Sequence, residues 1–251
     1  MPTPEPLPNN GGTAAICLTN VTKRYHGRAV VDAISLTIPM GETLVLLGTS
    51  GCGKTTTLKM LNRLIDADSG TVEINGVDVQ QQEPHVLRRS IGYVIQDAGL
   101  FPHYTVADNI AVVPRLLEWD AERIRQRTQE LMAMLRLPET ILTRFPDQLS
   151  GGQRQRIGLA RALASDPPII LMDEPFGALD PITRAAIRRE FRQLDALQQK
   201  TIVLVTHDVR EAFVLGDRVA LMDAGQIIQL GPPDTLRDHP ATAFVQEYMA
   251  L

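Results

Sequence analysis

The sequence of 251 residues lacks several features that would fix its compartment or its ligands. It has two cysteines, Cys17 and Cys52, too few for a disulfide framework or a cysteine-rich zinc module, so a reducing compartment fits best. No apolar run approaches the ~18 residues of a membrane span. The first residues lack the basic start and apolar segment of a signal peptide. These absences predict a chain that stays in the cytosol and touches a membrane only through partner proteins.

An excess of basic residues is also missing. The chain carries 25 basic and 29 acidic residues, for a net charge of −4, and has no strongly basic segment. This balance argues against a nucleic-acid partner. A hydrophobic content of 44% and a charged content of 22% are typical of a globular protein with a sizeable core, in one large domain or two small ones.

The segment Gly48–Thr56 has the spacing of a phosphate-binding loop, with Lys54 and Thr55 at its end. An apolar run typical of a buried strand precedes it, and a helical pattern follows. Glycines allow the backbone N–H groups to converge on phosphates, and the helix N-terminus adds positive potential. Lys54 can reach the β- and γ-phosphates, and the Thr55 hydroxyl can ligate Mg²⁺. The alternative, a glycine-rich connector between a strand and a helix, does not require this full spacing.

A second segment, Leu149–Gln153, reads Leu-Ser-Gly-Gly-Gln. One interpretation is purely structural, because Ser150 and Gln153 have the spacing of a capping box that starts a helix. Gly151 and Gly152 weaken that explanation, since glycine in the first turn lowers helix stability. They are expected if a ligand must approach the exposed backbone N–H groups.

The remaining pattern predicts an α/β fold with a parallel sheet, a flanking antiparallel sheet and a helical insertion over about residues 105–165. Residues 1–14 are expected to form a flexible tail, and residues 15–251 the folded domain. Expected strands cover residues 16–21, 30–38, 43–47, 70–76, 91–95, 169–172 and 201–206, with a hairpin formed by 218–221 and 226–230. Expected helices start at Thr105 and near Ser150, cover residues 183–199, and end the chain at 242–251.

Taken together, these motifs resemble those of ATP-binding cassette (ABC) ATPases. Gly48–Thr56 is similar to their Walker A loop, Ile169–Asp173 to Walker B, and Leu149–Gln153 to their signature motif. Other positions resemble the Q-loop glutamine, the D-loop, the switch histidine and the adenine-stacking aromatic: Gln96, Ala178–Asp180 (with Gly177 where many members have Ser), His207 and Tyr25. The resemblance covers about residues 16–248 and implies the ABC ATPase fold, with a P-loop NTPase core, and ATP and Mg²⁺ as cofactors.

The resemblance implies a role for each of these residues. Glu174 would polarise the attacking water, His207 would contact the γ-phosphate, and Gln96 would sense Mg²⁺ or water. Thr55, Gln96 and Asp173 would form the metal site. ATP would contact Tyr25, Gly48, Ser50, Gly51, Cys52, Gly53, Lys54, Thr55, Thr56, Ser150, Gly151, Gly152, Gln153 and Asp180.

Structural alternatives exist for the less specific positions. Asp173 and Glu174 alone could be a solvated acidic strand end, and His207 an unremarkable histidine after a strand. Tyr25 alone would be an ordinary half-buried aromatic. Cys52 is best interpreted as a small tolerated side chain at a variable position of the loop.

Finer resemblance points to one branch of the family. The segments Asn62–Ile65, Val94–His103 and Asp173–Arg184 look like those of osmoprotectant importers, which carry quaternary amines such as glycine betaine, choline and carnitine. This implies an ATPase subunit at the cytoplasmic face of the membrane, acting as a homodimer or pseudo-dimer across two ATP molecules, with permease subunits and, indirectly, a substrate-binding protein. The alternatives are an importer of another polar solute, such as an amino acid, and an ABC ATPase without a transport role.

Overall fold

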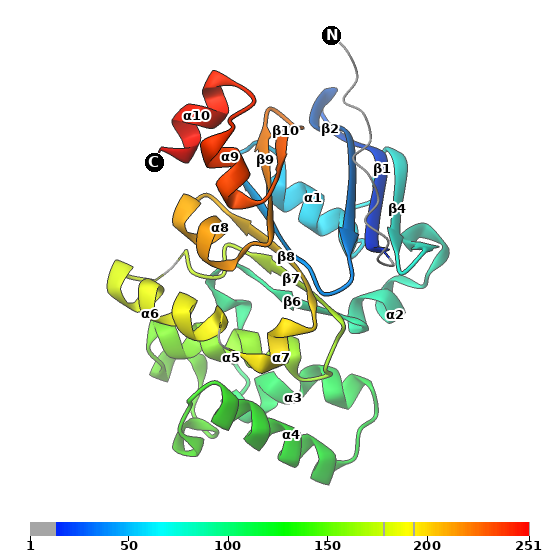
Figure 1. Ribbon diagram of the computed structural model, residues 1–251. Helices are drawn as coiled ribbons and strands as arrows, with labels where there is room; N and C mark the ends of the chain where they lie inside the picture. The colour runs from blue at the N-terminus through cyan, green and yellow to red at the C-terminus, as the bar shows by residue number, and fades with distance from the viewer. Residues whose placement is uncertain (1–13, 178, 193, 251) are drawn as a thin grey trace.

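Two β-sheets form the framework of the chain. A computed structural model describes residues 14–177, 179–192 and 194–250 (Figure 1). Met1–Thr13 of the expected tail, Ala178 and Leu251 therefore lie outside the described residues, whereas Ala14 is the first residue of a strand. The strands are β1 (Ala14–Tyr25), β2 (Arg28–Pro39), β3 (Thr43–Gly48), β4 (Ser69–Ile74), β5 (Val77–Asp78), β6 (Ile91–Val94), β7 (Ile169–Asp173), β8 (Thr201–Thr206), β9 (Arg218–Asp223) and β10 (Gln226–Gly231).

Helices connect most of these strands. The α-helices are α1 (Lys54–Leu61), α2 (Pro84–Arg89), α3 (Val106–Leu116), α4 (Ala121–Met134), α5 (Gly151–Leu163), α6 (Pro181–Arg192), α7 (Asp195–Gln198), α8 (Val209–Leu215), α9 (Pro233–Asp238) and α10 (Ala243–Met249). Short 3₁₀ turns cover Val79–Gln81, Gln96–Gly99, Glu139–Ile141 and Pro146–Gln148. None of the described helices combines the length and apolar character needed to cross a lipid bilayer.

The larger sheet has six strands in the order β10-β9-β3-β8-β7-β6. Its strands pair in parallel except for the β9–β10 hairpin. Alternate residues of β3 pack on opposite faces: Leu44 and Leu46 join one hydrophobic core cluster, while Val45 and Leu47 join the other. A strand covered on both faces needs a continuous apolar run, which is what the sequence provides.

The smaller sheet has four strands in the order β2-β1-β4-β5 and is antiparallel. Helix α1 lies between the two sheets, as Figure 1 shows, and contacts strands of both. Its Leu58 and Leu61 are buried in one cluster with Ile16 and Leu36 of the smaller sheet. The phosphate-loop helix is thus fixed by a hydrophobic core shared between two sheets.

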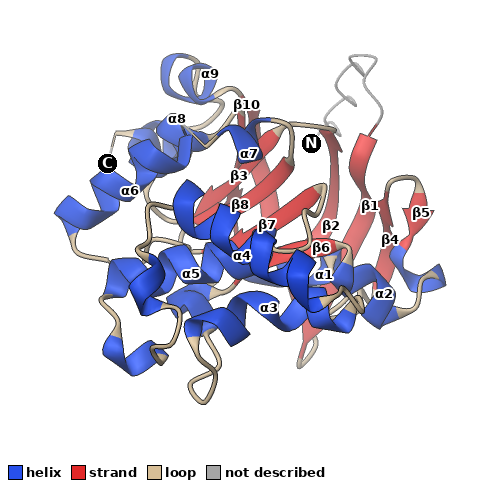
Figure 2. Cartoon of the chain, turned by 90° about the horizontal axis from the view of Figure 1, so that it is seen from below, coloured by secondary structure: helices blue, strands red, loops and turns tan. Residues whose placement is uncertain are grey.

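Helices α3, α4 and α5 gather on one side of the larger sheet (Figure 2). Ile110, Leu131 and Ile157, one from each helix, are almost fully buried in a common cluster. The side chain of Thr105 accepts a hydrogen bond from the Asp108 amide at the start of α3, so the predicted helix start is confirmed. The predicted limits of a separate helical subdomain, about residues 105–165, stay a prediction.

The predicted α/β fold with a parallel and an antiparallel sheet is confirmed. One predicted helix, residues 183–199, is wrong, because the segment forms two helices, α6 and α7. Phe191 and Leu197 are both buried, yet six positions in a continuous helix would place them on different faces. The break at Leu194, whose backbone is extended, lets both side chains reach the core. Helices α2, α8 and α9 were not predicted.

Gly92 of β6 should be essential for packing α5 on the sheet. A Cβ atom there would lie 2.6 Å from the Ala162 carbonyl oxygen and 3.0 Å from Pro167 Cγ. We expect Gly92→Ala to lower the free energy of unfolding by about 1–3 kcal/mol, as overpacking does. Urea denaturation would measure this. Gly231→Ala is the control, because its Cβ would meet Leu236 Cδ1 at an ordinary 3.4 Å. Equal stability of the two variants would contradict the prediction.

Candidate functional site

The loop between β3 and α1 curves back on itself through its glycines. Gly48 has φ of +149° and Gly53 has φ of +107°. A side chain at Gly48 would strike the Met222 carbonyl oxygen at 2.2 Å, and one at Gly53 would strike the Val30 carbonyl oxygen at 2.3 Å. Both positions therefore require glycine for their backbone angle and for lack of space. The loop that the sequence predicts is held against β9 on one side and β2 on the other.

Lys54 begins α1 and is buried within the loop. Its Nζ atom donates to the carbonyl oxygens of Gly48 at 2.9 Å and Thr49 at 2.8 Å. A buried ammonium group needs such partners because desolvation is costly. Its charge is thus held at the N-terminus of α1, an end of a helix that itself favours an anion.

Cys52 is a buried residue of the same loop. Its Sγ atom lies 3.8 Å from Lys54 Nζ. Burial raises the pKa of the Cys52 thiol, although Lys54 acts in the opposite direction. These contacts agree with the interpretation of Cys52 as a small side chain that fills space.

Thr55 and Asp173 meet across the strand end. The Thr55 hydroxyl donates to Asp173 Oδ1 at 2.8 Å. Asp173 is the last residue of β7 and is buried. Burial raises the pKa of the Asp173 carboxyl, while the Thr55 hydrogen bond and Lys59 oppose that rise. A hydroxyl and a carboxylate oxygen side by side are hard oxygen ligands that suit Mg²⁺. Among the described residues, no group of three or more His, Cys, Asp and Glu side chains could hold a metal.

Glu174 and His207 follow two neighbouring strands. Glu174 has φ of +43°, and its amide donates to the Val205 carbonyl of β8 at 3.0 Å. Glu174 Oε1 lies 3.3 Å from His207 Nδ1, and the His207 ring is about half exposed. A positive φ is uncommon for glutamate and persists only where the surroundings hold it. The two side chains are therefore close enough to interact, directly after the strand end that Asp173 forms.

A second carboxylate lies beneath this edge. Glu211 of α8 is buried, and Glu211 Oε2 accepts from the Thr206 hydroxyl at 2.6 Å. Burial raises the pKa of Glu211, while the Thr206 hydrogen bond opposes the shift. Sequence reasoning missed this pair. The signal was an acidic residue five positions after a strand-ending threonine, on the inward face of a short helix.

Ser150 and Gln153 form the capping box that was considered as a structural alternative. Ser150 Oγ accepts from the Gln153 amide at 3.2 Å, and Gln153 Oε1 accepts from the Ser150 amide at 3.0 Å. The box is therefore present and starts α5. A Cβ on Gly151 would lie 3.7 Å from Leu179, so the start of α5 lies beside the segment that contains Asp180.

The other predicted site residues lie at exposed positions. Gln96 begins the 3₁₀ turn that follows β6, and Tyr25 ends β1 with Lys23 Nζ 5.7 Å from its ring centre. Asp180 lies directly before α6. Gln96 stands at the same sheet edge as Asp173, because Val94 and Met172 are paired in register. In the part of the chain that the structure describes, no hydrogen bond or ion pair joins Tyr25 or Ser150 to the phosphate loop.

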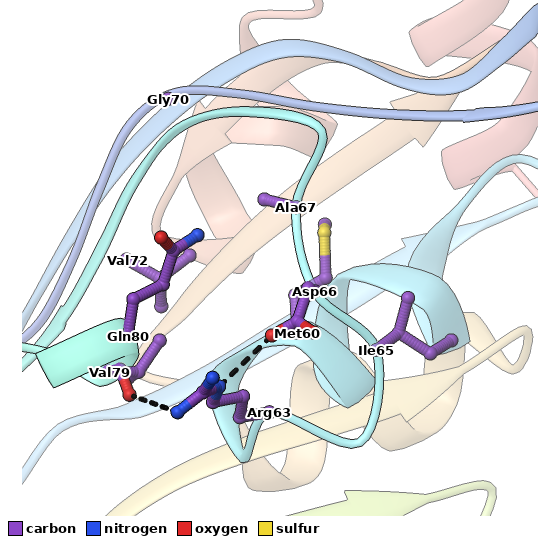
Figure 3. A pocket seen from close by; sticks show the side chains of 9 residues that line it. All are labelled: Met60, Arg63, Ile65, Asp66, Ala67, Gly70, Val72, Val79 and Gln80. Atoms are coloured by element: carbon purple, nitrogen blue, oxygen red, sulfur yellow. Dashed lines mark hydrogen bonds and ion pairs between the residues drawn. The ribbon is translucent and has the colours of Figure 1, made fainter. Parts of the chain in front are cut away.

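A hollow at the far end of α1 is distinct from the phosphate loop (Figure 3). Its volume is only about 10 Å³, and it is lined mainly by apolar side chains from the end of α1, the segment 63–67 that follows it, β4 and the turn at Val79–Gln81. Arg63 within it donates to Asp66 at 3.0 Å and to the Val79 carbonyl at 3.5 Å. Because its charged groups pair with one another and with the backbone, they brace the end of α1.

Comparison with known proteins identifies the family of this chain. A family model described as "ABC transporter" matches residues 31–177. The chain is 51% identical over 233 residues to the glycine betaine/carnitine/choline transport ATP-binding protein OpuCA of Bacillus subtilis, covering 92% of this chain and 61% of that protein. It is 49% identical over 230 residues to the glycine betaine uptake system ATP-binding protein YehX of Escherichia coli, covering 92% of this chain and 75% of that protein.

The chain spans about three fifths of the length of the first of these relatives. Among solved structures, it is similar to the ATP-binding cassette MJ0796 in a dimeric post-hydrolysis state bound to ADP and Pi. That likeness has a TM-score of 0.78 and 34% identity, and covers 87% of this chain and 98% of the other.

Glu211→Gln should stabilise the chain at neutral pH. The pKa of Glu211 is higher in the folded chain than in the unfolded chain. As pH rises, the unfolded chain therefore loses this proton first. Wild-type stability falls between the unfolded and the folded pKa values of Glu211. Glutamine can still accept from Thr206. We expect a Tm increase on the order of 2–4 °C at pH 8, equivalent to about 1 kcal/mol, and little difference near pH 4.

Glu122→Gln is the matched control, because the Glu122 side chain is 71% exposed and its pairing with Arg125 is a surface ion pair. It should leave Tm nearly unchanged at both pH values. A lower Tm for Glu211→Gln than for wild type at pH 8 would contradict the prediction. That result would mean that nearby arginines favour the ionised form of Glu211 more than burial disfavours it.

Proposed function

Because this chain belongs to the ABC transporter family, we propose that it binds and hydrolyses ATP to energise an importer of quaternary-amine osmoprotectants. The observation that carries the ATPase part is the cluster at one sheet edge. Thr55 and Asp173 are 2.8 Å apart, and Glu174 and His207 are 3.3 Å apart beside them. The osmoprotectant part is supported by the relatives OpuCA and YehX, whose names state that class of solute.

The phosphates of ATP bind in the loop from Gly48 to Thr56. Lys54 exchanges its bonds to loop carbonyls for bonds to the β- and γ-phosphates. Thr55, Asp173 and Gln96 would hold Mg²⁺, which when bound would neutralise charge on the phosphates. The adenine ring stacks on Tyr25, which is exposed enough to offer a ring face.

Hydrolysis depends on the residues that follow β7 and β8. Glu174 accepts a proton from the attacking water, and the hydrogen bond from its amide to the Val205 carbonyl fixes its backbone at the strand end. His207 contacts the γ-phosphate and orients the water through its interaction with Glu174. Phosphoryl transfer needs mainly positioning and charge neutralisation, which these groups supply.

The second half of each ATP site comes from another copy of the chain. Ser150 to Gln153, with the adjacent Asp180, contact the γ-phosphate bound by the other copy's Lys54, giving a dimer across two ATP molecules. The dimeric, ADP- and Pi-bound form of MJ0796 supports this arrangement. Closure of the dimer is transmitted to permease subunits through the loop from Gln96 to His103. The chain acts at the cytoplasmic face of the membrane, and a separate binding protein selects the solute.

Glu174→Gln should abolish hydrolysis but preserve ATP binding. The amide keeps the size of the side chain but cannot accept the water proton. We expect turnover to fall by about 10²–10⁴-fold, with ATP-dependent dimers that persist on gel filtration. Turnover close to that of the wild type would exclude Glu174 as the base.

Lys54→Ala is the matched variant, because it removes phosphate contacts and leaves Glu174 in place. It should lose ATP affinity and form no ATP-dependent dimer. Comparison of Glu174→Gln with Lys54→Ala therefore separates loss of hydrolysis from loss of ATP binding. Normal ATP binding by Lys54→Ala would contradict the role of the loop.

The transport role predicts co-purification with a permease and a binding protein. We expect that binding protein to bind glycine betaine, choline or carnitine in calorimetry. Deletion of this chain should abolish uptake of the same solute, and the wild-type chain, but not Glu174→Gln, should restore it. Binding of an amino acid instead would favour the alternative importer, and failure to recover any permease would favour a non-transport ABC ATPase.

A further inference from the structure

The turn that begins with Gln96 has a strained backbone. It covers Gln96–Gly99 and directly follows β6. Ala98 has φ of +63° and Gly99 has φ of +48°. A left-handed conformation is unfavourable for alanine and persists only where neighbouring groups hold it. Ala98 is almost fully buried, so its surroundings must supply that restraint.

Arg161 of α5 restrains the Gln96–Gly99 turn. Its guanidinium donates to the Ala98 carbonyl at 2.9 Å and to the Gly99 carbonyl at 2.8 Å. The side chain is buried, and its charge lies 5.6 Å from the centre of the Phe101 ring. A planar fork with fixed geometry can hold two consecutive carbonyls at once, which a single ammonium cannot.

The same face of α5 touches the turn at a second point. A Cβ on Gly158 would lie 3.1 Å from Ala98 Cβ and 3.2 Å from the Ala98 carbonyl oxygen. Asn109 of α3 holds the following residues, since its amide group accepts from the Phe101 amide at 2.8 Å and donates to the Phe101 carbonyl at 3.2 Å. The turn is therefore attached to the helices and not only to the sheet.

Helix α5 carries Ser150–Gln153 at its other end. Arg161 lies eleven positions after Ser150, a helical length of about 16 Å. A single helix thus connects the capping-box segment to the turn that contains Gln96.

We propose that Arg161 is a positioning residue that fixes the Gln96–Gly99 turn against α5 and thereby holds Gln96 in place. The inference rests on the proposed ATPase function and deepens it. Arg161 contacts no reacting atom and acts through Gln96.

Arg161→Lys tests this, because it keeps the charge but not the fork. In the full chain we expect kcat to fall about tenfold, the effect of a small misplacement of a site residue, with the Kd for ATP changed less than about twofold. In a Gln96→Ala background, the same substitution should lower kcat by less than about twofold more, since residues acting as one unit are non-additive. Independent, multiplicative losses would overturn the inference.

Arg127→Lys is the matched control. Arg127 of α4 also donates to two consecutive carbonyls, those of Leu163 at 3.0 Å and Ala164 at 3.4 Å, at the end of the same helix. Its kcat should stay near the wild-type value, and a loss equal to that of Arg161→Lys would assign the effect to α5 stability alone. Gly158→Ala perturbs the turn without removing charge and should also lower kcat, with unchanged ATP affinity.

Amide hydrogen exchange gives a readout that does not need turnover. Arg161→Lys should speed exchange in peptides covering residues 96–104 at least several-fold and leave those of β3 unchanged. Unchanged exchange at 96–104 would overturn the inference. Absence of ATP hydrolysis by the wild-type chain, with the exchange effect present, would instead count against the proposed function.

Discussion

The in-register parallel pairing of β3, β8 and β7 is the constraint on which the site depends. Leu47 is paired with Thr206, and Val205 with Asp173. Every segment that leaves these strands at their carboxyl ends therefore starts from the same edge. Residues separated by more than a hundred positions, such as Thr55 and Asp173, meet within hydrogen-bonding distance because of this register. A shift of one strand by one residue would also exchange the two faces of each apolar run, so the two hydrophobic clusters stabilise the site geometry as well as the fold.

Around that edge the chain buries several charged groups, and each has a local partner. Lys54 is held by loop carbonyls, Asp173 by the Thr55 hydroxyl, Glu211 by the Thr206 hydroxyl, and Arg161 by the carbonyls of the Gln96–Gly99 turn. Unpaired, each group would carry a large desolvation penalty. Lys54 is paired with neutral groups only, so a stronger electrostatic partner can replace them. A phosphate can compete with a carbonyl for Lys54, whereas a carboxylate partner would have held it more firmly.

The sequence was most informative where local pattern and tertiary position coincide. Continuous apolar runs predicted β3, β7 and β8, because a parallel strand buried on both faces has no polar alternation. It was least informative where burial across distant elements decides the outcome. Helix α6 ends near Phe191 because Phe191 and Leu197 both pack in the core, and no local signal marks that end. Nothing in the local sequence distinguishes Arg161 from the other arginines of α5, since only the fold places Ala98 and Gly99 beside it. The roles of the individual site residues stay predictions drawn from resemblance.

The capping box at Ser150 and a ligand-binding role for the same segment are compatible. The box uses the amides of Ser150 and Gln153, each bonded to the other residue's side chain. The amides of Gly151 and Gly152 lie in the first helical turn, which has no intrahelical acceptor for them. Because neither residue has a side chain, an anion can approach those two amides closely, at the positive end of the α5 dipole. The box therefore holds the helix start rigid while the glycines keep it open, and Leu149–Gln153 needs serine, glycine and glutamine for different physical reasons.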